Sequence, residues 1–174
     1  MHFFNHYNYN IVKYDLINKF RYKAIKKIPK ITSAVLRFRL KHNDMKHLIA
    51  ALAALELITS QKGVLIKSKV PNVTLKLRKG QPIGCKVTIR KNTLFSFITN
   101  LYSNISTKKK NVKKKADFKN KMISFKIQNV LLFSHLESNY QFFKNLSRLD
   151  ISLMTTANDF DDYVYLLKAY KLNV

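Results

Sequence analysis

The sequence predicts an α+β fold, a single two-layer domain with a mainly antiparallel sheet, helices packed on one face and a basic surface on the other. Two patterns lead to this prediction. Short stretches such as residues 75–78 and 85–90 alternate apolar with polar side chains, as half-buried strands do. Longer stretches place apolar residues at helical spacing. A chain of 174 residues is long enough to form one hydrophobic core but too short for two domains of ordinary size, so we expect one domain over residues 1–174.

The first predicted elements are a helix over residues 10–20 and a strand over residues 31–40. The helix is expected to have one apolar face, which comprises Ile11, Tyr14, Leu16, Ile17 and Phe20. Along the strand, successive side chains point to opposite sides of the sheet. The core-facing set is Leu36, Phe38 and Leu40, and the opposite set is Val35, Arg37 and Arg39.

Two further helices are predicted in the middle of the chain. Asn43 or Asp44 can cap a helix over residues 45–57, whose alanines allow close packing on the sheet. Thr93 is expected to cap a second helix over residues 94–102. The apolar face of that second helix comprises Leu94, Phe97, Ile98 and Leu101.

The remaining elements are strands and one last helix. The expected strands are residues 64–66, 75–78, 85–90, 122–133 and 149–157. Residues 79–84 have turn residues at both ends and connect the second of these strands to the third. Asn158 is expected to cap a final helix over residues 159–170. Its first turn carries Asp161 and Asp162, which suit the positive end of a helix.

The charge of the chain points to a polyanionic partner. Lysine and arginine number 33 against 9 acidic residues, for a net charge of +24. That is well above the magnitude of about 2–8 that solubility alone asks of a small domain. The basic residues belong almost entirely to the first three quarters of the chain, whereas acids slightly outnumber them after residue 136. We therefore expect residues 159–174 to pack against the apolar face of the sheet or a protein neighbour rather than nucleic acid.

A lysine-rich segment interrupts the predicted elements. The lysines concerned are Lys108, Lys109, Lys110, Lys113, Lys114 and Lys115. Like charges this close repel, so a loop at about residues 105–119 is expected to be disordered without a partner and to contact phosphates non-specifically. The alternative interpretation is an ordinary solvated loop.

No pattern in the sequence indicates an enzyme, a metal site or a cofactor. The histidines and the single cysteine, Cys85, do not have the spacing of a metal site. One cysteine allows no intrachain disulfide and suggests a reducing compartment. The longest apolar run, residues 48–55, is too short to span a bilayer, so no membrane insertion is expected.

Three stretches resemble the ribosomal protein L five family of bacteria and organelles. They are Gln61-Lys62, the run Lys-x-Arg-Lys-Gly-x-Pro-Ile-Gly-Cys-Lys-Val-Thr-x-Arg over residues 76–90, and Leu-Asp-Ile-x-x-x-Thr-Thr-Ala over residues 149–157. The resemblance implies a structural, RNA-binding protein in the central protuberance of the large ribosomal subunit. Its implied RNA partners are 5S rRNA, large-subunit rRNA and the elbow of the peptidyl-site tRNA. Its implied protein partners are neighbouring central-protuberance proteins and, across an intersubunit bridge, a small-subunit head protein.

The resemblance also implies which residues bind RNA. Gln61 and Thr88 match family positions that recognise 5S rRNA on the sheet surface, whereas Arg37 stands where the family has asparagine. The expected rRNA-binding set is Arg37, Gln61, Lys62, Lys86, Thr88 and Arg90. The expected tRNA-facing loop carries Lys67, Lys69, Lys76, Arg78 and Lys79. The alternative interpretation of Gln61 is a loop amide that faces water, and that of Thr88 is a residue that occurs there for its strand propensity.

The expected compartment is the mitochondrial matrix. Lysine far outnumbers arginine, and asparagine, isoleucine and phenylalanine are abundant, as an AT-rich, organelle-encoded gene would give. A plastid or an AT-rich bacterial cytoplasm are the alternatives. The competing function is a non-ribosomal basic RNA-binding or RNA-chaperone protein. A basic protein on an acidic membrane surface ranks last because no cationic helix with a clean apolar face is predicted. Whether this ribosome retains a 5S rRNA stays open.

Overall fold

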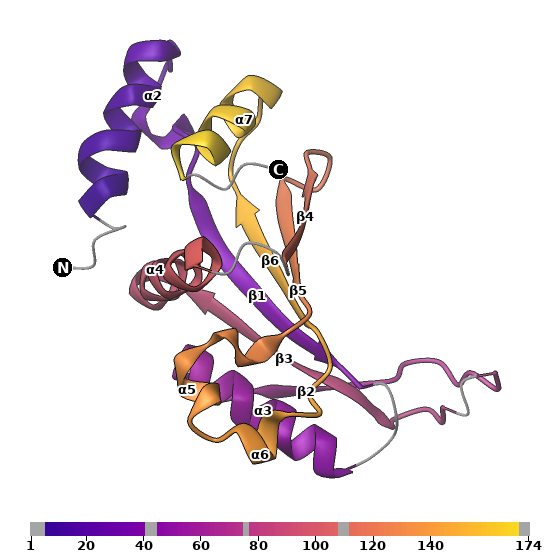
Figure 1. The fold of residues 1–174 in the computed structure, drawn as a ribbon. Helices are drawn as coiled ribbons and strands as arrows, with labels where there is room; N and C mark the ends of the chain where they lie inside the picture. The colour runs from indigo at the N-terminus through magenta and orange to yellow at the C-terminus, as the bar shows by residue number, and fades with distance from the viewer. Residues whose placement is uncertain (1–5, 41–44, 75–76, 108–111, 171–174) are drawn as a thin grey trace.

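One antiparallel sheet organises the protein (Figure 1). The computed structural model describes residues 6–40, 45–74, 77–107 and 112–170, with the backbone alone for residues 104–107 and 112–116. The strands are β1 (Ile31–Arg39), β2 (Val64–Lys67), β3 (Pro82–Arg90), β4 (Val112–Asp117), β5 (Met122–Ile127) and β6 (Leu149–Thr155). Their order is β2-β3-β1-β6-β5-β4, and every neighbouring pair is antiparallel. The predicted α+β class with an antiparallel sheet is confirmed.

Helices cover one side of this sheet, as predicted. The longest are α3 (Met45–Thr59) and α4 (Lys91–Thr107), and both contact β3. Two single-turn helices, α5 (Ser134–Glu137) and α6 (Tyr140–Phe143), follow the 3-10 turn η4 (Val130–Leu132) and pack on α3 (Figure 1). The core side of the strands is fully buried beneath them. Its central residues are Leu36, Phe38, Cys85, Ile89, Ile151 and Leu153.

The first and the last described helices pack together at one end of the sheet (Figure 1). The helical segment formed by η1 (Asn8–Val12) and α2 (Lys13–Lys19) packs on α7 (Phe160–Ala169). The Tyr7 hydroxyl donates to the Ala169 carbonyl at 3.0 Å, and the Tyr22 hydroxyl donates to the Asp162 carboxylate at 2.8 Å. A set of buried α7 side chains joins the main core: Tyr163, Leu166 and Leu167. The prediction that this acidic segment packs into protein is confirmed for α7, and residues 171–174 lie outside the described residues.

The predicted apolar face of the first helix is confirmed for Leu16 and Phe20, which pack in or against the core, and is wrong for the other three residues. The structure buries Val12 and Leu16, and it leaves Ile11, Tyr14 and Ile17 exposed. The π-helical turn of η1 contains an extra residue per turn, which rotates the face that meets α7 away from the stripe expected for a regular α-helix. This surface of the N-terminal helix therefore presents several large apolar side chains to solvent.

The strand predicted at residues 75–78 is not a strand of the sheet. Leu77 forms an isolated bridge with Asn72, and Leu75 and Lys76 lie outside the described residues. The turn expected at Gly84 is also wrong, because Gly84 lies within β3. A Cβ atom on Gly84 would lie 2.3 Å from the Phe38 carbonyl oxygen, so the residue permits close approach of β1 rather than a turn.

The predicted caps differ from those in the structure. Helix α4 already begins at Lys91, and the Thr93 hydroxyl donates to the Arg90 carbonyl at 2.7 Å instead of accepting from the helix. Asp159, not Asn158, precedes α7, while the Asn158 side chain accepts from Lys121 Nζ at 2.7 Å. The two candidate caps of α3, at positions 43 and 44, lie outside the described residues.

The lysine-rich loop expected at about residues 105–119 is largely replaced by regular structure. Helix α4 extends to Thr107, and β4 begins at Val112 and pairs with β5 through Lys113, Lys114 and Lys115. Backbone pairing with β5 outweighs the repulsion between neighbouring lysines. Lys108, Lys109 and Lys110 lie outside the described residues. The strand predicted over residues 122–133 ends at Ile127, because the Asn129 side chain accepts from Leu131 N at 3.1 Å and starts η4.

Candidate nucleic-acid interface

The side of the sheet that faces away from α3 and α4 is rich in basic residues. We call it the basic face and define it by the outward positions of β1, β3, β5 and β6. Its cationic members are Arg37, Arg39, Lys86, Arg90 and Lys126. Side chains alternate between the two sides of a strand, so these residues point outward while the residues between them are buried in the core. Four predicted rRNA-binding residues thus share one surface: Arg37, Lys86, Thr88 and Arg90.

The strand register places the members of the basic face in rows across the sheet. Arg37 lies opposite Lys86 on one side and opposite Asp150 on the other. Asp150 in turn lies opposite Lys126 of β5. A second row brings hydroxyl groups together and comprises Thr88, Val35, Ser152 and Ser124. Of these hydroxyls, that of Thr88 is exposed, that of Ser124 is half-buried and that of Ser152 is buried. The face therefore offers cations that can bind phosphates beside an exposed threonine that can bind ribose.

Asp150 is the single acid on the outward side of β1, β3 and β6, and it organises the arginines around it. Its carboxylate lies 3.3 Å from Arg39 Nε and 3.4 Å from Arg148 Nε, although it is itself buried. Arg37 is half-buried beside it and donates to Ser152 Oγ at 3.3 Å. One carboxylate thus holds two guanidinium groups in place, those of Arg39 and Arg148, while Arg37 is held by Ser152, and the face keeps its positive charge.

Gln61 and Lys62 lie at the border of the basic face rather than on it. Gln61 Nε2 donates to Thr93 Oγ1 at 3.4 Å, and Thr93 is bonded to Arg90 at the end of β3. Gln61 is therefore half-buried and held by protein, not a loop amide that faces water only. Lys62 is exposed beside it. The structure brings both residues toward the Arg90 end of the face.

A long hairpin arm between β2 and β3 projects beyond the sheet (Figure 1). Ser68 pairs with Gly80 and Gln81 at its base, and Asn72 and Leu77 exchange two backbone hydrogen bonds of 3.0 and 2.9 Å near its tip. The exposed cations of the arm are Lys67, Lys69, Arg78 and Lys79, and Lys76 lies outside the described residues. Val73 is 93% exposed at the tip, a feature that its sequence context did not indicate.

Sequence reasoning missed part of the basic face. Lys126, Arg148 and Asp150 were not among the predicted residues, although they lie beside those that were. The alternation along residues 122–127 could have identified Lys126 as outward-facing. The role of Asp150 could not be found that way, because it depends on which strand lies next to β1.

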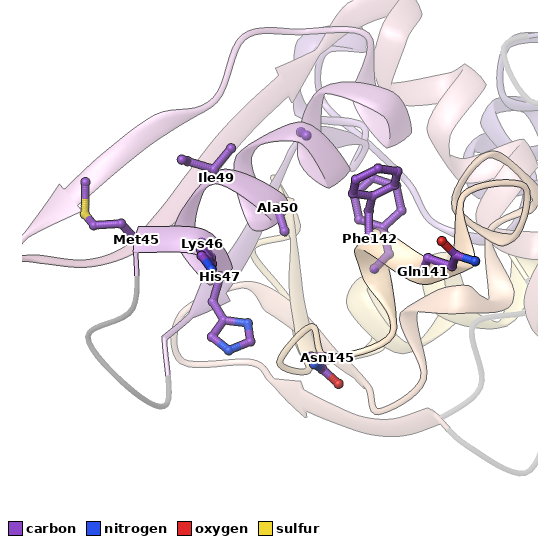
Figure 2. Close-up of a pocket in the computed structure, with 10 residues that line it drawn as sticks. Met45, Lys46, His47, Ile49, Ala50, Gln141, Phe142 and Asn145 are labelled. Atoms are coloured by element: carbon purple, nitrogen blue, oxygen red, sulfur yellow. The ribbon is translucent and has the colours of Figure 1, made fainter.

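A separate apolar groove lies on the helical side of the protein, between α3 and α6 (Figure 2). Its volume is about 1060 Å³. Ile49 and Phe142 line it, and Phe142 is 76% exposed. Its polar residues are Lys46, His47, Gln141 and Asn145. Within the described part of the chain, no group of three or more histidine, cysteine, aspartate or glutamate side chains could hold a metal ion.

Three relatives among known proteins resemble this chain over nearly its whole length. The large ribosomal subunit protein uL5m of Reclinomonas americana is 32% identical over 178 residues, which cover 96% of this chain and 94% of the relative. The large ribosomal subunit protein uL5 of Geotalea uraniireducens is 31% identical over 170 residues, with 94% and 93% coverage. The uL5 of Borrelia hermsii is 33% identical over 175 residues, with 94% and 91% coverage. No protein-family model matches the chain.

The chain belongs to the uL5 family of large-subunit ribosomal proteins. The family resemblance predicted from the sequence motifs is thereby confirmed. In this uL5 protein the motif residues 82–90 form β3, and the motif at residues 149–157 forms β6 and the turn after it. Both strands flank β1, so the segments that resemble the family most strongly build the centre of the basic face. Among the described helices of the uL5 protein, none is both long and apolar enough to cross a membrane.

Proposed function

We propose that this uL5 protein is a structural constituent of the large ribosomal subunit and binds rRNA with its basic face. The observation that carries the proposal is the row Lys86, Arg37, Asp150 and Lys126 across four neighbouring strands, in which three cations accompany a single acid. Such a surface favours a polyanion, because three basic side chains and one acid leave a net positive charge. A catalytic role has no support from the relatives, which are named as ribosomal proteins.

The basic face is suited to the backbone of a folded RNA. Lysine and arginine would contact phosphates and set the orientation, while the exposed Thr88 would bind a 2′-hydroxyl group. We infer that 5S rRNA in the central protuberance is the partner, with Gln61, Lys62 and Arg90 at the border of the contact. The hydrogen bond from Arg37 to Ser152 Oγ fixes where its guanidinium lies and supports a positioning role at this site.

The hairpin arm is proposed to reach the elbow of the peptidyl-site tRNA. It extends away from the sheet, and its exposed cations are spread along its length: Lys67, Lys69, Arg78 and Lys79. Lys76 would add to this set. Because a backbone-paired arm keeps its direction, it can present charge at a distance from the main rRNA contact. Large-subunit rRNA, neighbouring central-protuberance proteins and a small-subunit head protein are the other proposed partners.

The proposed compartment is the mitochondrion, and the gene is proposed to be organelle-encoded. A relative named uL5m supports this placement, although bacterial uL5 proteins match nearly as well. Fractionating an extract on a sucrose gradient tests both the particle and the compartment. We expect the protein in the large-subunit and monosome fractions of mitochondria. Recovery only in small-subunit or ribosome-free fractions would contradict a ribosomal role and favour an RNA chaperone.

Binding measurements test which surface recognises the RNA. Thr88→Val combined with Gln61→Ala removes neutral hydrogen bonds, each worth about 0.5–1.5 kcal/mol. We expect cognate 5S rRNA to lose about tenfold in preference over an unrelated duplex, with an unchanged salt dependence. Replacing the lysines of residues 108–115 by glutamine should do the reverse and flatten the slope of log affinity against log salt by roughly 3 to 4 units. If the lysine replacements abolish the preference for 5S rRNA and the Thr88 and Gln61 replacements leave it intact, the basic face is not the recognition surface.

A further inference from the structure

A second hollow lies at the end of the sheet away from the hairpin arm (Figure 1), where the N-terminal helix meets the segment before β1. It has a volume of about 240 Å³, and its lining residues come from the N-terminal helical segment and from the segment before β1: Asn8, Tyr9, Lys13, Ile25, Lys26, Ile28, Pro29 and Lys30. That volume is less than the roughly 300–1,000 Å³ of pockets that enclose a drug-sized ligand. It suits a flat group with the size of one nucleobase.

The walls of this hollow have the chemistry that an unstacked base requires. Tyr9 supplies an aromatic ring and is 57% exposed, and Ile25 supplies an exposed aliphatic side chain. Asn8 adds an amide that can donate to and accept from the edge of a base. Ile28 and Pro29 are buried and contribute an apolar base to the hollow. Aromatic side chains beside amide groups are the usual means by which proteins hold splayed-out bases of single-stranded RNA.

The charge around the hollow is entirely positive. Lys13, Lys26 and Lys30 line it, and no carboxylate does. None of these three lysines forms a salt bridge with a described acid. The arrangement therefore places cations for a phosphate backbone around an apolar slot, and it disfavours a cationic or purely apolar ligand.

The hollow is held by anchored backbone. Lys30 N donates to Thr156 Oγ1 at 3.0 Å, and Thr156 N donates to the Lys30 carbonyl at 3.0 Å. Ile25 lies in the 3-10 turn η2 (Ile25–Lys27), which the Lys27 N to Ala24 carbonyl bond of 3.0 Å closes. On the helical side, Tyr7 is bonded to α7. The walls are thus positioned before any ligand arrives.

We propose that this hollow binds one unpaired nucleotide of an RNA strand, with the base against Tyr9 and the phosphates beside Lys13, Lys26 and Lys30. The inference rests on the proposed RNA-binding function, and it adds a site separate from the basic face. The two sites would contact different RNA features: the basic face a folded backbone, the hollow a bulged or single-stranded nucleotide.

The test uses the full chain and two probes, a single-stranded hexauridylate and a 5S rRNA fragment. Tyr9→Ala should weaken hexauridylate binding about tenfold, because stacking on an aromatic ring is lost, whereas Tyr9→Phe should bind like the parent. Tyr14→Ala is the matched control, since Tyr14 lies on the same helix with 58% exposure but does not line the hollow. For the charge, Lys26→Ala should lower the salt slope by roughly 0.7, while Lys23→Ala, outside the hollow, should not. A hexamer containing 5-iodouridine should crosslink to Tyr9.

The outcomes separate the two proposals. If Tyr14→Ala weakens hexauridylate binding as much as Tyr9→Ala does, or crosslinks map only elsewhere, the nucleotide site is wrong. The proposed function would then stand provided that the 5S fragment still binds and that Arg37→Ala weakens it. Tyr9→Ala should change binding of the 5S fragment less than twofold if that fragment presents no unpaired nucleotide. Failure of the chain to bind either probe would overturn both proposals.

Discussion

Arg37 of β1 and Lys86 of β3 are direct cross-strand partners on the outward side of the sheet, so two positive side chains lie opposite each other at its centre. Like charges in this position destabilise an antiparallel pair. The sequence nevertheless keeps both, and Asp150 on the other side of Arg37 offsets only part of the repulsion. The fold thus gives up some stability for a surface that a polyanion can stabilise.

Replacing Lys86 should separate folding from binding. Lys86→Gln should raise the free energy of unfolding by about 0.2–1 kcal/mol, because it removes the repulsion with Arg37. It should also weaken rRNA binding and reduce the salt slope by roughly 0.9. Urea titrations and binding at several salt concentrations measure the two effects. Lys46→Gln on α3 is the control and should change neither quantity appreciably. Lower stability in Lys86→Gln would contradict the like-charge interpretation.

Removing the charge of Asp150 should have the opposite effect on stability. Asp150→Asn leaves Arg39 and Arg148 without their shared acid, and the free energy of unfolding should fall by about 1–3 kcal/mol. The loss should shrink as salt is added, because salt screens the repulsion that remains. Chemical unfolding at low and high salt measures this. Asp161→Asn, in an exposed position on α7, is the control. A variant as stable as the parent at low salt would exclude an organising role for Asp150.

Two glycines of the β2–β3 region should respond differently to the same substitution. Gly84→Ala places a methyl group against the Phe38 carbonyl, so β1 and β3 must separate, and we expect a loss of about 3 kcal/mol or more. Gly80→Ala meets no neighbour, but its positive φ of 85° should cost about 1–2 kcal/mol. Thermal and chemical unfolding of both variants gives the comparison. Equal losses would show that β1 and β3 can separate without penalty.

The single thiol should report unfolding. Burial raises the pKa of Cys85 to about 11, against 9.0 for a free thiol, so at pH 8 the folded protein should react with iodoacetamide far more slowly than the urea-unfolded chain. Above pH 9 the unfolded state releases this proton more readily than the folded state. The contribution of Cys85 to stability is therefore complete below pH 9 and is lost as the pH rises toward 11. Mass spectrometry follows the reaction, and rapid alkylation of the folded chain would exclude a buried thiol.

The features that depend on local side-chain alternation could be predicted from the sequence. The pattern of Cys85 through Arg90 placed Lys86 and Thr88 on the side opposite the core, and the sheet has them there. The features that depend on a distant partner could not. From the sequence, the lysines of β4 were predicted to repel one another in a loop, because nothing nearby in the chain showed that they pair with β5. Asp150 was recognised only as part of a family motif. Its ion pairs could not be predicted, because Arg39 comes from β1 and Arg148 from the segment before β6.

The order of the strands leaves β2 and β4 at the two margins of the sheet, where backbone groups have no further strand to pair with. A second chain can pair with such an edge strand, and this pairing can start aggregation. Here β2 has only four residues, and β4 reads Val-Lys-Lys-Lys-Ala-Asp. A short edge strand and a lysine-rich edge strand both disfavour strand pairing between two copies of the protein. The lysines for which we propose RNA contact would thus also keep newly made copies of the protein apart.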